Sequence, residues 1–234
     1  KGKWKKSLPR GRDVSFTQTD APFQIVYGEC RVPGLFALRH VTNNKLWWNN
    51  IIIVASHQIT AIDEVWIDDI KMEFNGYAGQ PDPRWASGPT NANGRNFQGR
   101  VFAATEQLGH PDQTAQTDAV SILGDKWAAN HRLRNRAHVY LILVWDAATF
   151  PEGDPAIDFK LRGKPVYDPR TGQTAFVDTL GRQIGSNAAL CLADYLTNTV
   201  YGPGFAWTDI DTTSLGAAAD ICDQDVALKA GGTE

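Results

Sequence analysis

Apolar and polar side chains alternate along several segments of the chain, and this period of two is typical of half-buried β-strands. Within residues 62–70, Val65 and Ile67 share one face, while Glu64, Trp66 and Asp68 share the other. The β-branched run at residues 51–54 indicates a strand that is buried on both faces. We therefore expect strands at residues 22–28, 30–41, 46–55, 62–70, 137–145 and 157–163.

Turn-forming residues separate these segments. Asn43-Asn44 marks one turn, and Asp68-Asp69 followed by residues 71–74 resembles a hairpin. The sequence DPRTG at residues 168–172 predicts a second hairpin, because an aspartate opens the turn, a proline presets φ and a glycine closes it.

The apolar period changes to 3.6 after Gly185, which predicts helices near the C-terminal end. The first is expected at residues 187–196, with Ala188, Leu192 and Leu196 on its apolar face. The second is expected to start after Asp211-Thr212, whose side chains can cap free N–H groups, and to run to residue 222. The predicted fold class is α+β, predominantly β, with mixed or antiparallel sheets, long loops and two short C-terminal helices.

Residues 75–99 are rich in glycine, proline, asparagine and serine, which indicates a long loop or insertion. We expect it to be held by packing of Trp85 and Phe97 or by a neighbouring chain. The predicted division is a basic arm at 1–20, β-rich segments at 21–74 and 119–186, a loop-rich insertion at 75–118 and a helical segment at 187–234.

Charge is distributed unevenly along the chain. The first twelve residues carry six bases and no acid, so removing them changes the net charge from −3 to −9. Either this arm is a solvated tail, or it docks on an acidic surface of a partner, a nucleic acid or another copy. The candidate docking residues in the arm are Lys3, Lys5, Lys6, Arg10 and Arg12.

Three cysteines without a CxxC pair, Cys30, Cys191 and Cys222, suit neither a disulfide framework nor a zinc site, and they favour a reducing compartment. The apolar runs are far shorter than the roughly 18 residues that cross a bilayer, so no membrane span is expected. Because no initiator methionine is present, we expect a fragment of a longer protein.

Sequence motifs for catalysis are absent. The acidic doublets Asp63-Glu64 and Asp68-Asp69 cannot act as facing carboxylate pairs by themselves, because adjacent strand residues point to opposite faces. The five histidines have no HxH or HExxH spacing, no serine lies in GxSxG, and neither GxGxxG nor GxxxxGK[ST] occurs. We expect no catalytic residues, no metal and no cofactor.

Eight tryptophans leave a binding role open. We expect most of Trp127, Trp145 and Trp207 inside the protein, and we predict Trp47 or Trp48 as an interface residue because asparagines surround them. The basic cluster at residues 131–136 either meets phosphate or forms a solvated turn or subunit contact.

Four blocks of the sequence carry a family resemblance. They are PFQIVYGECRVPG at 22–34, ITAIDEVWIDD at 59–69, FKLRGKPVYDPRTGQ at 159–173 and NAALCLADYLTNTVYGPG at 187–204. In this order they resemble the N-terminal part of the tail tip (host specificity) protein J family of lambda-like long-tailed phages. IDTTSLGAAADICD at 210–223 resembles the next helix of the family, whereas residues 75–118 are the least similar part.

The resemblance implies a structural hub subunit without catalysis. Three copies would close the distal end of the tail tube, carry the central fibre and open for DNA release. The implied partners are further copies of the chain, adjacent tail-tip and distal-tail proteins and the tape-measure protein, and DNA would pass without specific binding. The implied location is the virion tail tip, after assembly in the host bacterial cytoplasm.

Two other functions remain open. A carbohydrate-binding or cell-wall-degrading β-domain of a phage tail would use the tryptophans and acids. A nucleic-acid-binding module would use Arg132, Arg134 and Arg136.

Overall fold

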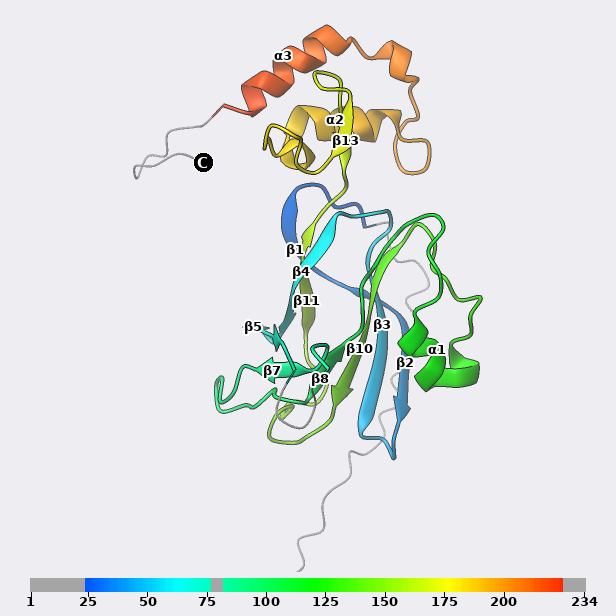
Figure 1. Cartoon of the computed structure of the whole chain (residues 1–234), viewed down its shortest axis with the longest axis vertical. Coiled ribbons are helices and arrows are strands. Elements are labelled where there is room, and N and C mark those ends of the chain that lie inside the picture. Colours follow the sequence, from blue (N-terminus) through cyan, green and yellow to red (C-terminus); the bar gives the residue numbers. More distant parts are fainter. Residues whose placement is uncertain (1–23, 77–81, 225–234) are drawn as a thin grey trace, which may run out of the picture.

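The computed structural model describes residues 24–76 and 82–224, and it confirms an α+β fold in which β-sheets predominate (Figure 1). The first sheet contains, in order, β1 (Glu29–Pro33), β11 (Ile157–Arg162), β4 (Ala61–Ile67) and β5 (Ile70–Lys71). The second contains β2 (Leu35–Thr42), β3 (Trp47–Ala55), β10 (Ala137–Val144) and β8 (Val101–Ala103), and β9 (Gln107–Leu108) also pairs with β10. All of these pairings are antiparallel.

The chain crosses between the sheets at Gly34. Strand β1 is an edge of the first sheet and β2 is an edge of the second, so one residue joins two sheet edges. A Cβ atom at Gly34 would lie 1.9 Å from Cγ2 of Ile52, and only glycine fits this close approach.

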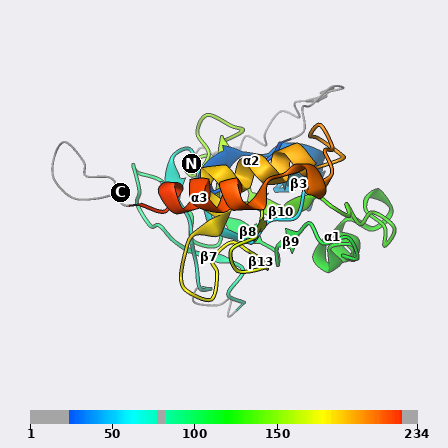
Figure 2. The same cartoon turned by 90° about the horizontal axis from the view of Figure 1, so that it is seen from above.

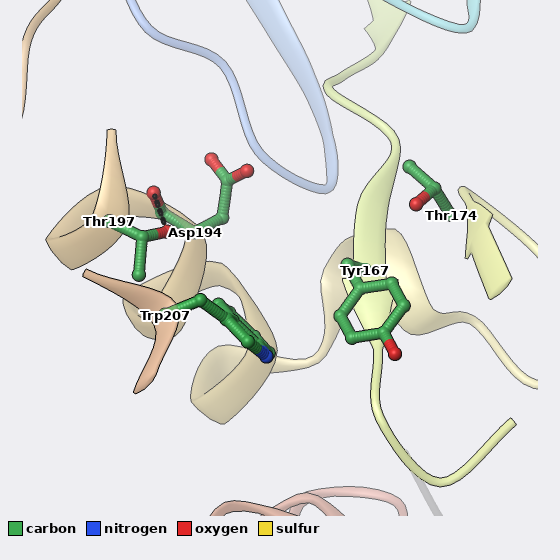
Figure 3. Close-up of a pocket in the computed structure, with 5 residues that line it drawn as sticks. All are labelled: Tyr167, Thr174, Asp194, Thr197 and Trp207. Atoms are coloured by element: carbon green, nitrogen blue, oxygen red, sulfur yellow. Dashed lines mark hydrogen bonds between the residues drawn. The ribbon is translucent and has the colours of Figure 1, made fainter. Parts of the chain in front are cut away.

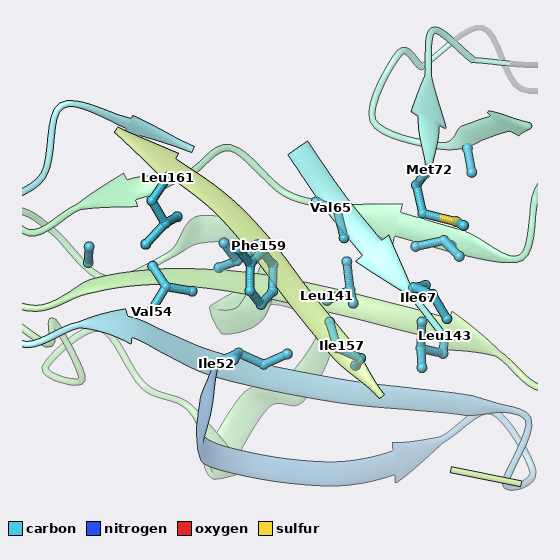
Figure 4. Packing of buried hydrophobic residues seen from close by; sticks show 14 of the residues in the cluster. Ile52, Val54, Val65, Ile67, Met72, Leu141, Leu143, Ile157, Phe159 and Leu161 are labelled. Atoms are coloured by element: carbon cyan, nitrogen blue, oxygen red, sulfur yellow. The ribbon is translucent and has the colours of Figure 1, made fainter. Parts of the chain in front are cut away.

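The main hydrophobic core lies between the two sheets (Figure 4). Alternate residues of each strand point into it, as the period of two requires. Loop side chains fill its end, and Phe97 and Phe150 are almost fully buried there. The strand residues of this core include Ile52, Val54, Val65, Ile67, Val139, Leu141, Leu143, Ile157, Phe159 and Leu161.

The opposite face of the second sheet has its own cover. Helix α1 (Thr117–Leu123) packs Ala119 and Leu123 onto Ile51 and Tyr140, and Trp127 completes this cluster. Strand β3 therefore has buried side chains on both faces, as predicted.

The last part of the chain forms a helical module, which we define as residues 166–224. It contains β12 (Val166–Asp168), β13 (Gln173–Ala175), α2 (Ala188–Thr197) and α3 (Thr212–Cys222). A small separate core of Val166, Ile184, Leu190 and Ala219 holds these elements together. The module lies beyond one end of the two packed sheets, which we call the sandwich, and α2 and α3 lie side by side (Figures 1 and 2).

Several predicted elements are confirmed. The turn at Asn43-Asn44 and the hairpin at Asp68-Asp69 both use positive φ values, and the DPRTG sequence joins β12 to β13. Asp211 caps α3 by accepting hydrogen bonds from the backbone N–H groups of Thr213 and Ser214. The strand predicted at residues 30–41 appears as β1 and β2, divided at Gly34.

The strand predicted at residues 22–28 is wrong for its described part, residues 24–28. This segment bonds instead to scattered partners, because Val26 N–H donates to the His57 ring and Ser56 N–H donates to the Gln24 carbonyl. These bonds satisfy the backbone without a ladder.

Two predictions about helices also need correction. Helix α1 was not predicted, so the described residues hold three α-helices rather than two. In α2 the buried residues are Leu190 and Ala193, whereas Leu192 of the predicted apolar face is 57% exposed.

In the predicted loop at residues 75–99, the described Trp85 and Phe97 pack against other parts of the protein, as expected. Strand β6 (Glu73–Phe74) pairs with β7 (Ala86–Gly88), Phe97 is fully buried, and the ring of Trp85 lies 5.2 Å from that of Phe102. The division of the chain into the five predicted segments stays a prediction.

Candidate functional site

A pocket of about 350 Å³ lies in the helical module (Figure 3). Tyr167 and Thr174 of the β12–β13 hairpin form one side, and Asp194, Thr197 and Trp207 form the other. The rings of Tyr167 and Trp207 meet edge to face with centroids 5.2 Å apart. In Figure 3 the Asp194 carboxylate points away from these two rings.

The Asp194 carboxylate belongs to a polar cluster between the sandwich and the helical module. We call Tyr27, Lys164, Asp194 and Tyr201 the junction cluster. Lys164 Nζ donates to both carboxylate oxygens of Asp194, at 2.8 and 2.7 Å, and to the Tyr201 hydroxyl at 2.7 Å. The Tyr27 hydroxyl donates to Asp194 Oδ2 at 2.5 Å.

Local backbone bonds position these side chains. Gly28 N–H donates to the carbonyl of Gly185 in the module, and Lys164 N–H donates to the carbonyl of Val26, which places Lys164 beside the segment that carries Tyr27. The side chain of Asn187 caps α2 by accepting from Leu190 N–H, and α2 in turn places Asp194 facing Lys164.

The pKa values of Tyr27 and Lys164 in the junction cluster are both raised. Burial and the hydrogen bond to Asp194 both raise the pKa of Tyr27, so this phenol stays a neutral donor. Burial by itself would lower the pKa of Lys164, but the hydrogen bonds to Asp194 and Tyr201 outweigh burial and raise it. Lys164 therefore carries a full charge near neutral pH.

The donors and acceptors of this cluster are matched. The three N–H groups of the Lys164 ammonium have three acceptors, and both oxygens of Asp194 accept hydrogen bonds. Such a matched arrangement binds two parts of a protein together. We interpret the junction cluster as a structural contact that holds α2 on the sandwich.

A second charged cluster fastens α3 to the β12–β13 hairpin. The guanidinium of Arg170 makes a bidentate contact with Asp168, in which Nε and Nη2 donate to the two carboxylate oxygens. Its Nη1 donates to the carboxylates of Asp220 and Asp223 at the end of α3, at 2.6 and 2.8 Å. Asp168 has no exposed surface. Burial would raise its pKa, but hydrogen bonds from the side chain and backbone of Arg170 outweigh burial and lower it.

The acidic doublets of the sequence each contact basic side chains. The pairs are Asp63 with Arg162 at 3.0 Å, Glu64 with Lys71 at 2.5 Å, Asp68 with Arg95 at 2.8 Å and Asp69 with Arg31 at 2.6 Å. In addition, Trp66 Nε1–H donates to Glu64. Each of these carboxylates therefore forms an ion pair with a basic side chain. A hydrolase would instead need two carboxylates that face each other across a substrate bond.

The ring of His57 joins two backbone segments. His57 is buried, and its Nε2 atom accepts from Val26 N–H at 2.8 Å while Nδ1 donates to the Gln58 carbonyl at 2.7 Å. The three cysteines are free thiols. Within residues 24–76 and 82–224, no three or more His, Cys, Asp or Glu side chains gather as a metal site would need.

The candidate docking residues fall into two groups. Lys3, Lys5, Lys6, Arg10 and Arg12 lie outside the described residues. Trp47 and Trp48 are half-buried on opposite faces of β3, where Trp47 packs on Trp85 with ring centroids 6.1 Å apart and Trp48 lies near Phe150 at 6.3 Å. Their role in partner docking stays a prediction.

Other predicted surface residues are also placed. Trp127 is buried as expected, whereas Trp145 and Trp207 are half-buried. In the basic cluster at residues 131–136, Arg132 and Arg134 are exposed.

Exposed apolar side chains concentrate on the helical module, a feature that sequence analysis did not find. Among the described residues nine large hydrophobics are exposed, and all except Val41 lie in this module. They are Tyr167, Val177, Leu180, Leu192, Tyr195, Val200, Phe205 and Ile221. In the sequence, the spacing of Leu192 and Tyr195 places both on one helical face. The same spacing also fits a buried face, so it does not predict their exposure.

No helix within the described ranges is both long enough and apolar enough to pass through a membrane.

Comparisons with known proteins give only distant similarity. No protein-family model and no curated protein matches the chain. A chain of the virion of a native gene transfer agent particle is similar, with 16% identity and a TM-score of 0.39. The match covers 83% of this chain and 35% of that chain. At these values it establishes neither a shared fold nor a shared function.

Proposed function

We propose that this chain is a structural subunit of a bacteriophage tail tip. In this proposal three copies form a collar that closes the distal end of the tail tube, carries the central fibre and opens for DNA ejection. The partners are further copies of the chain, adjacent tail-tip and distal-tail proteins and the tape-measure protein. The location is the virion, after assembly in the host cytoplasm.

One observation carries the proposal: the separate blocks that resemble the tail tip protein J family contact one another. Tyr27 comes from the first block, Lys164 from the third, and Asp194 and Tyr201 from the fourth, and together they make the junction cluster. The junction cluster thus joins three of the four blocks where the sandwich meets the module.

Two further contacts follow the same rule. Arg31 of the first block binds Asp69 of the second, at 2.6 Å. Arg170 of the third block binds Asp220 and Asp223 of the block at 210–223. Both contacts join residues of separate blocks, which supports the proposal.

The surface supports a role in assembly. The exposed apolar side chains of the helical module, Leu192 and Phe205 among them, would contact a second copy of the chain in the collar. The net charge of −9 without the first twelve residues suits a channel through which DNA passes without binding.

The deciding experiment is a reconstruction of the intact particle at side-chain resolution. We expect density for this chain in three copies around the tail axis at its distal end. Density at another position, or a single copy per particle, would refute the collar.

The basic arm gives a second test. If the arm docks on the preceding tail ring, deletion of residues 1–12 weakens incorporation into particles and leaves the thermal unfolding midpoint unchanged. Unchanged incorporation would show that the arm is a solvated tail.

A further inference from the structure

The rings of Tyr167 and Trp207 form an open aromatic corner in the helical module. The two rings stand nearly at right angles, with centroids 5.2 Å apart and an interplanar angle of 81°. Both line the pocket of about 350 Å³, where Tyr167 is 38% exposed and Trp207 is half-buried. An exposed corner of this kind offers flat apolar surface to a ring of another molecule.

The polar atoms of this pocket are mainly hydrogen-bond donors. Within residues 24–76 and 82–224, neither the indole N–H of Trp207 nor the hydroxyl of Tyr167 makes a hydrogen bond. In Figure 3 the indole nitrogen lies at the end of Trp207 nearer Tyr167. Both carboxylate oxygens of Asp194 already accept from Lys164, and this carboxylate points away from the two rings. A ligand of this pocket therefore has to supply acceptors.

A proline-rich segment has the required chemistry. Proline lacks an N–H group, and the polyproline II conformation leaves its carbonyl groups free to accept hydrogen bonds. Prolyl rings also pack on aromatic side chains. A neutral sugar packs on aromatic rings too, but its many hydroxyl groups need acceptors, and the lining residues include no asparagine, glutamine or glutamate. The excess of donors therefore favours the peptide over the sugar.

The charge of the module indicates which residues flank the prolines. Residues 166–224 contain seven aspartates and two arginines, and they contain no lysine, histidine or glutamate. Both arginines, Arg170 and Arg182, pair with aspartates of the module. Asp209 and Asp211 are exposed, follow Trp207 closely in the sequence and have no basic partner in the described part of the chain. Their charges complement a basic ligand.

We propose that the pocket between Tyr167 and Trp207 binds an extended, proline-rich and basic segment of another protein. A prolyl ring packs on the two aromatic rings, and a neighbouring carbonyl accepts from the indole N–H of Trp207. Lysine or arginine side chains of the segment pair with Asp209 and Asp211. Because a polyproline II segment is extended before it binds, little conformational entropy is lost. Binding of such a segment does not depend on a role in a phage tail.

Titration of the full chain with the peptide acetyl-KPPAPPK-amide tests this site. We expect saturable binding with a Kd below about 1 mM and a shift of the indole N–H signal of Trp207 in the NMR spectrum. The Trp207→Phe variant assigns that signal by its loss. The peptide acetyl-KGGAGGK-amide has the same charge without proline and should bind at least about tenfold more weakly. Equal affinities for the two peptides, or no saturable binding of the first, would overturn the proposal.

Variants of the aromatic corner locate the contact. Trp207→Ala should weaken binding of the proline peptide at least about tenfold, whereas Trp207→Phe keeps a ring, loses the donor and should show a smaller loss. Leu180→Ala is the matched control, because Leu180 is 75% exposed in the same module and does not line the pocket. Thermal unfolding midpoints show which variants stay folded, and Trp207→Phe preserves the test if Trp207→Ala unfolds. Unchanged affinity in a folded Trp207 variant would overturn the proposal.

The charges and the rival ligand are tested separately. The double variant Asp209→Asn, Asp211→Asn keeps side chains that can cap helices and should weaken binding about threefold, with a smaller salt dependence. Unchanged affinity would overturn the requirement for a basic segment. Cellotriose is the probe for a sugar site. If cellotriose shifts the Trp207 signal and the proline peptide does not, the pocket is a sugar site and the proposal is overturned.

Discussion

The ammonium of Lys164 and the carboxylate of Asp194 form the centre of the joint between sandwich and helical module. Each side chain is 19% exposed, and Lys164 reaches both oxygens of Asp194. A pair so shielded from water is screened less by salt than a surface pair. This contact therefore helps to hold the helical module on the sandwich.

We expect Asp194→Asn to destabilise the protein by about 2 kcal/mol, because Lys164 then keeps a partly buried charge without its counter-ion. Urea unfolding at pH 7 measures this change. The matched control is Asp125→Asn, which removes the partner of Lys126 in an exposed pair and should change stability by less than about 0.5 kcal/mol. Equal changes in the free energy of unfolding for the two substitutions would contradict the role of Asp194 in holding α2 on the sandwich.

Arg170→Ala should release α3 from the hairpin. The substitution leaves the buried Asp168 without its main counter-ion, so we expect a loss of about 3 kcal/mol and faster amide exchange in residues 212–222. Arg170→Lys keeps the charge but cannot make the two-pronged contact, and an intermediate loss is expected. Replacement of the exposed Arg134 by alanine is the control. Unchanged exchange of α3 in Arg170→Ala would show that packing alone holds this helix.

The sequence predicted those parts of the fold in which a local pattern has one solution. The alternation in β4 and β11, the turn at Asp168 and the cap at Asp211 each follow from neighbouring residues. Helix α2 shows the limit of such patterns. Its apolar residues fit two faces, one with Leu190 and Ala193 and one with Leu192, and only the packing of α2 against Val166 and Ala219 selects the first.

The junction cluster could not be predicted from spacing. Tyr27 lies 167 residues from Asp194 in the sequence, and no local rule joins them. The same reason explains the error at residues 24–28, where the hydrogen bond between Val26 and His57 depends on a contact 31 residues away. The indirect signal for the cluster was that its members lie in the blocks that carry the family resemblance.

The His57 ring predicts a loss of stability in mild acid. Burial lowers the pKa of His57; Lys164 also lowers it, while the carbonyl of Gln58 and Asp194 act in the opposite direction. The folded state therefore binds fewer protons than the unfolded state below about pH 6.5, so the free energy of unfolding falls as pH decreases from there. The slope from this group approaches about 1.4 kcal/mol per pH unit.

Urea unfolding between pH 7.5 and about pH 5 measures this slope. In His57→Gln the amide can still accept from Val26 N–H and does not titrate, so the slope should be smaller. A slope identical to that of the unsubstituted chain would assign the pH dependence to other groups.

The exposed Leu192 predicts a variant that separates assembly from folding. Because this side chain is 57% exposed, Leu192→Asp should leave the thermal unfolding midpoint nearly unchanged. In the proposed collar it should reduce incorporation into particles several-fold, since a charge would be buried between copies. Ala128→Asp, at an exposed loop position of the sandwich, is the control. Equal incorporation of both variants would remove this face from the interface.

The charge distribution predicts that the chain without residues 1–12 does not bind DNA appreciably. A chain lacking residues 1–12 has a net charge of −9, and phosphate binding requires clustered cations, so duplex DNA should bind more weakly than about 100 µM at physiological salt. Fluorescence anisotropy with a labelled duplex, repeated at several salt concentrations, measures this affinity. Micromolar affinity for duplex DNA with a steep salt dependence would contradict a channel through which DNA passes without binding. Loss of that binding on replacing Arg132, Arg134 and Arg136 by serine would then favour a nucleic-acid-binding module, because these side chains are the basic cluster of the body.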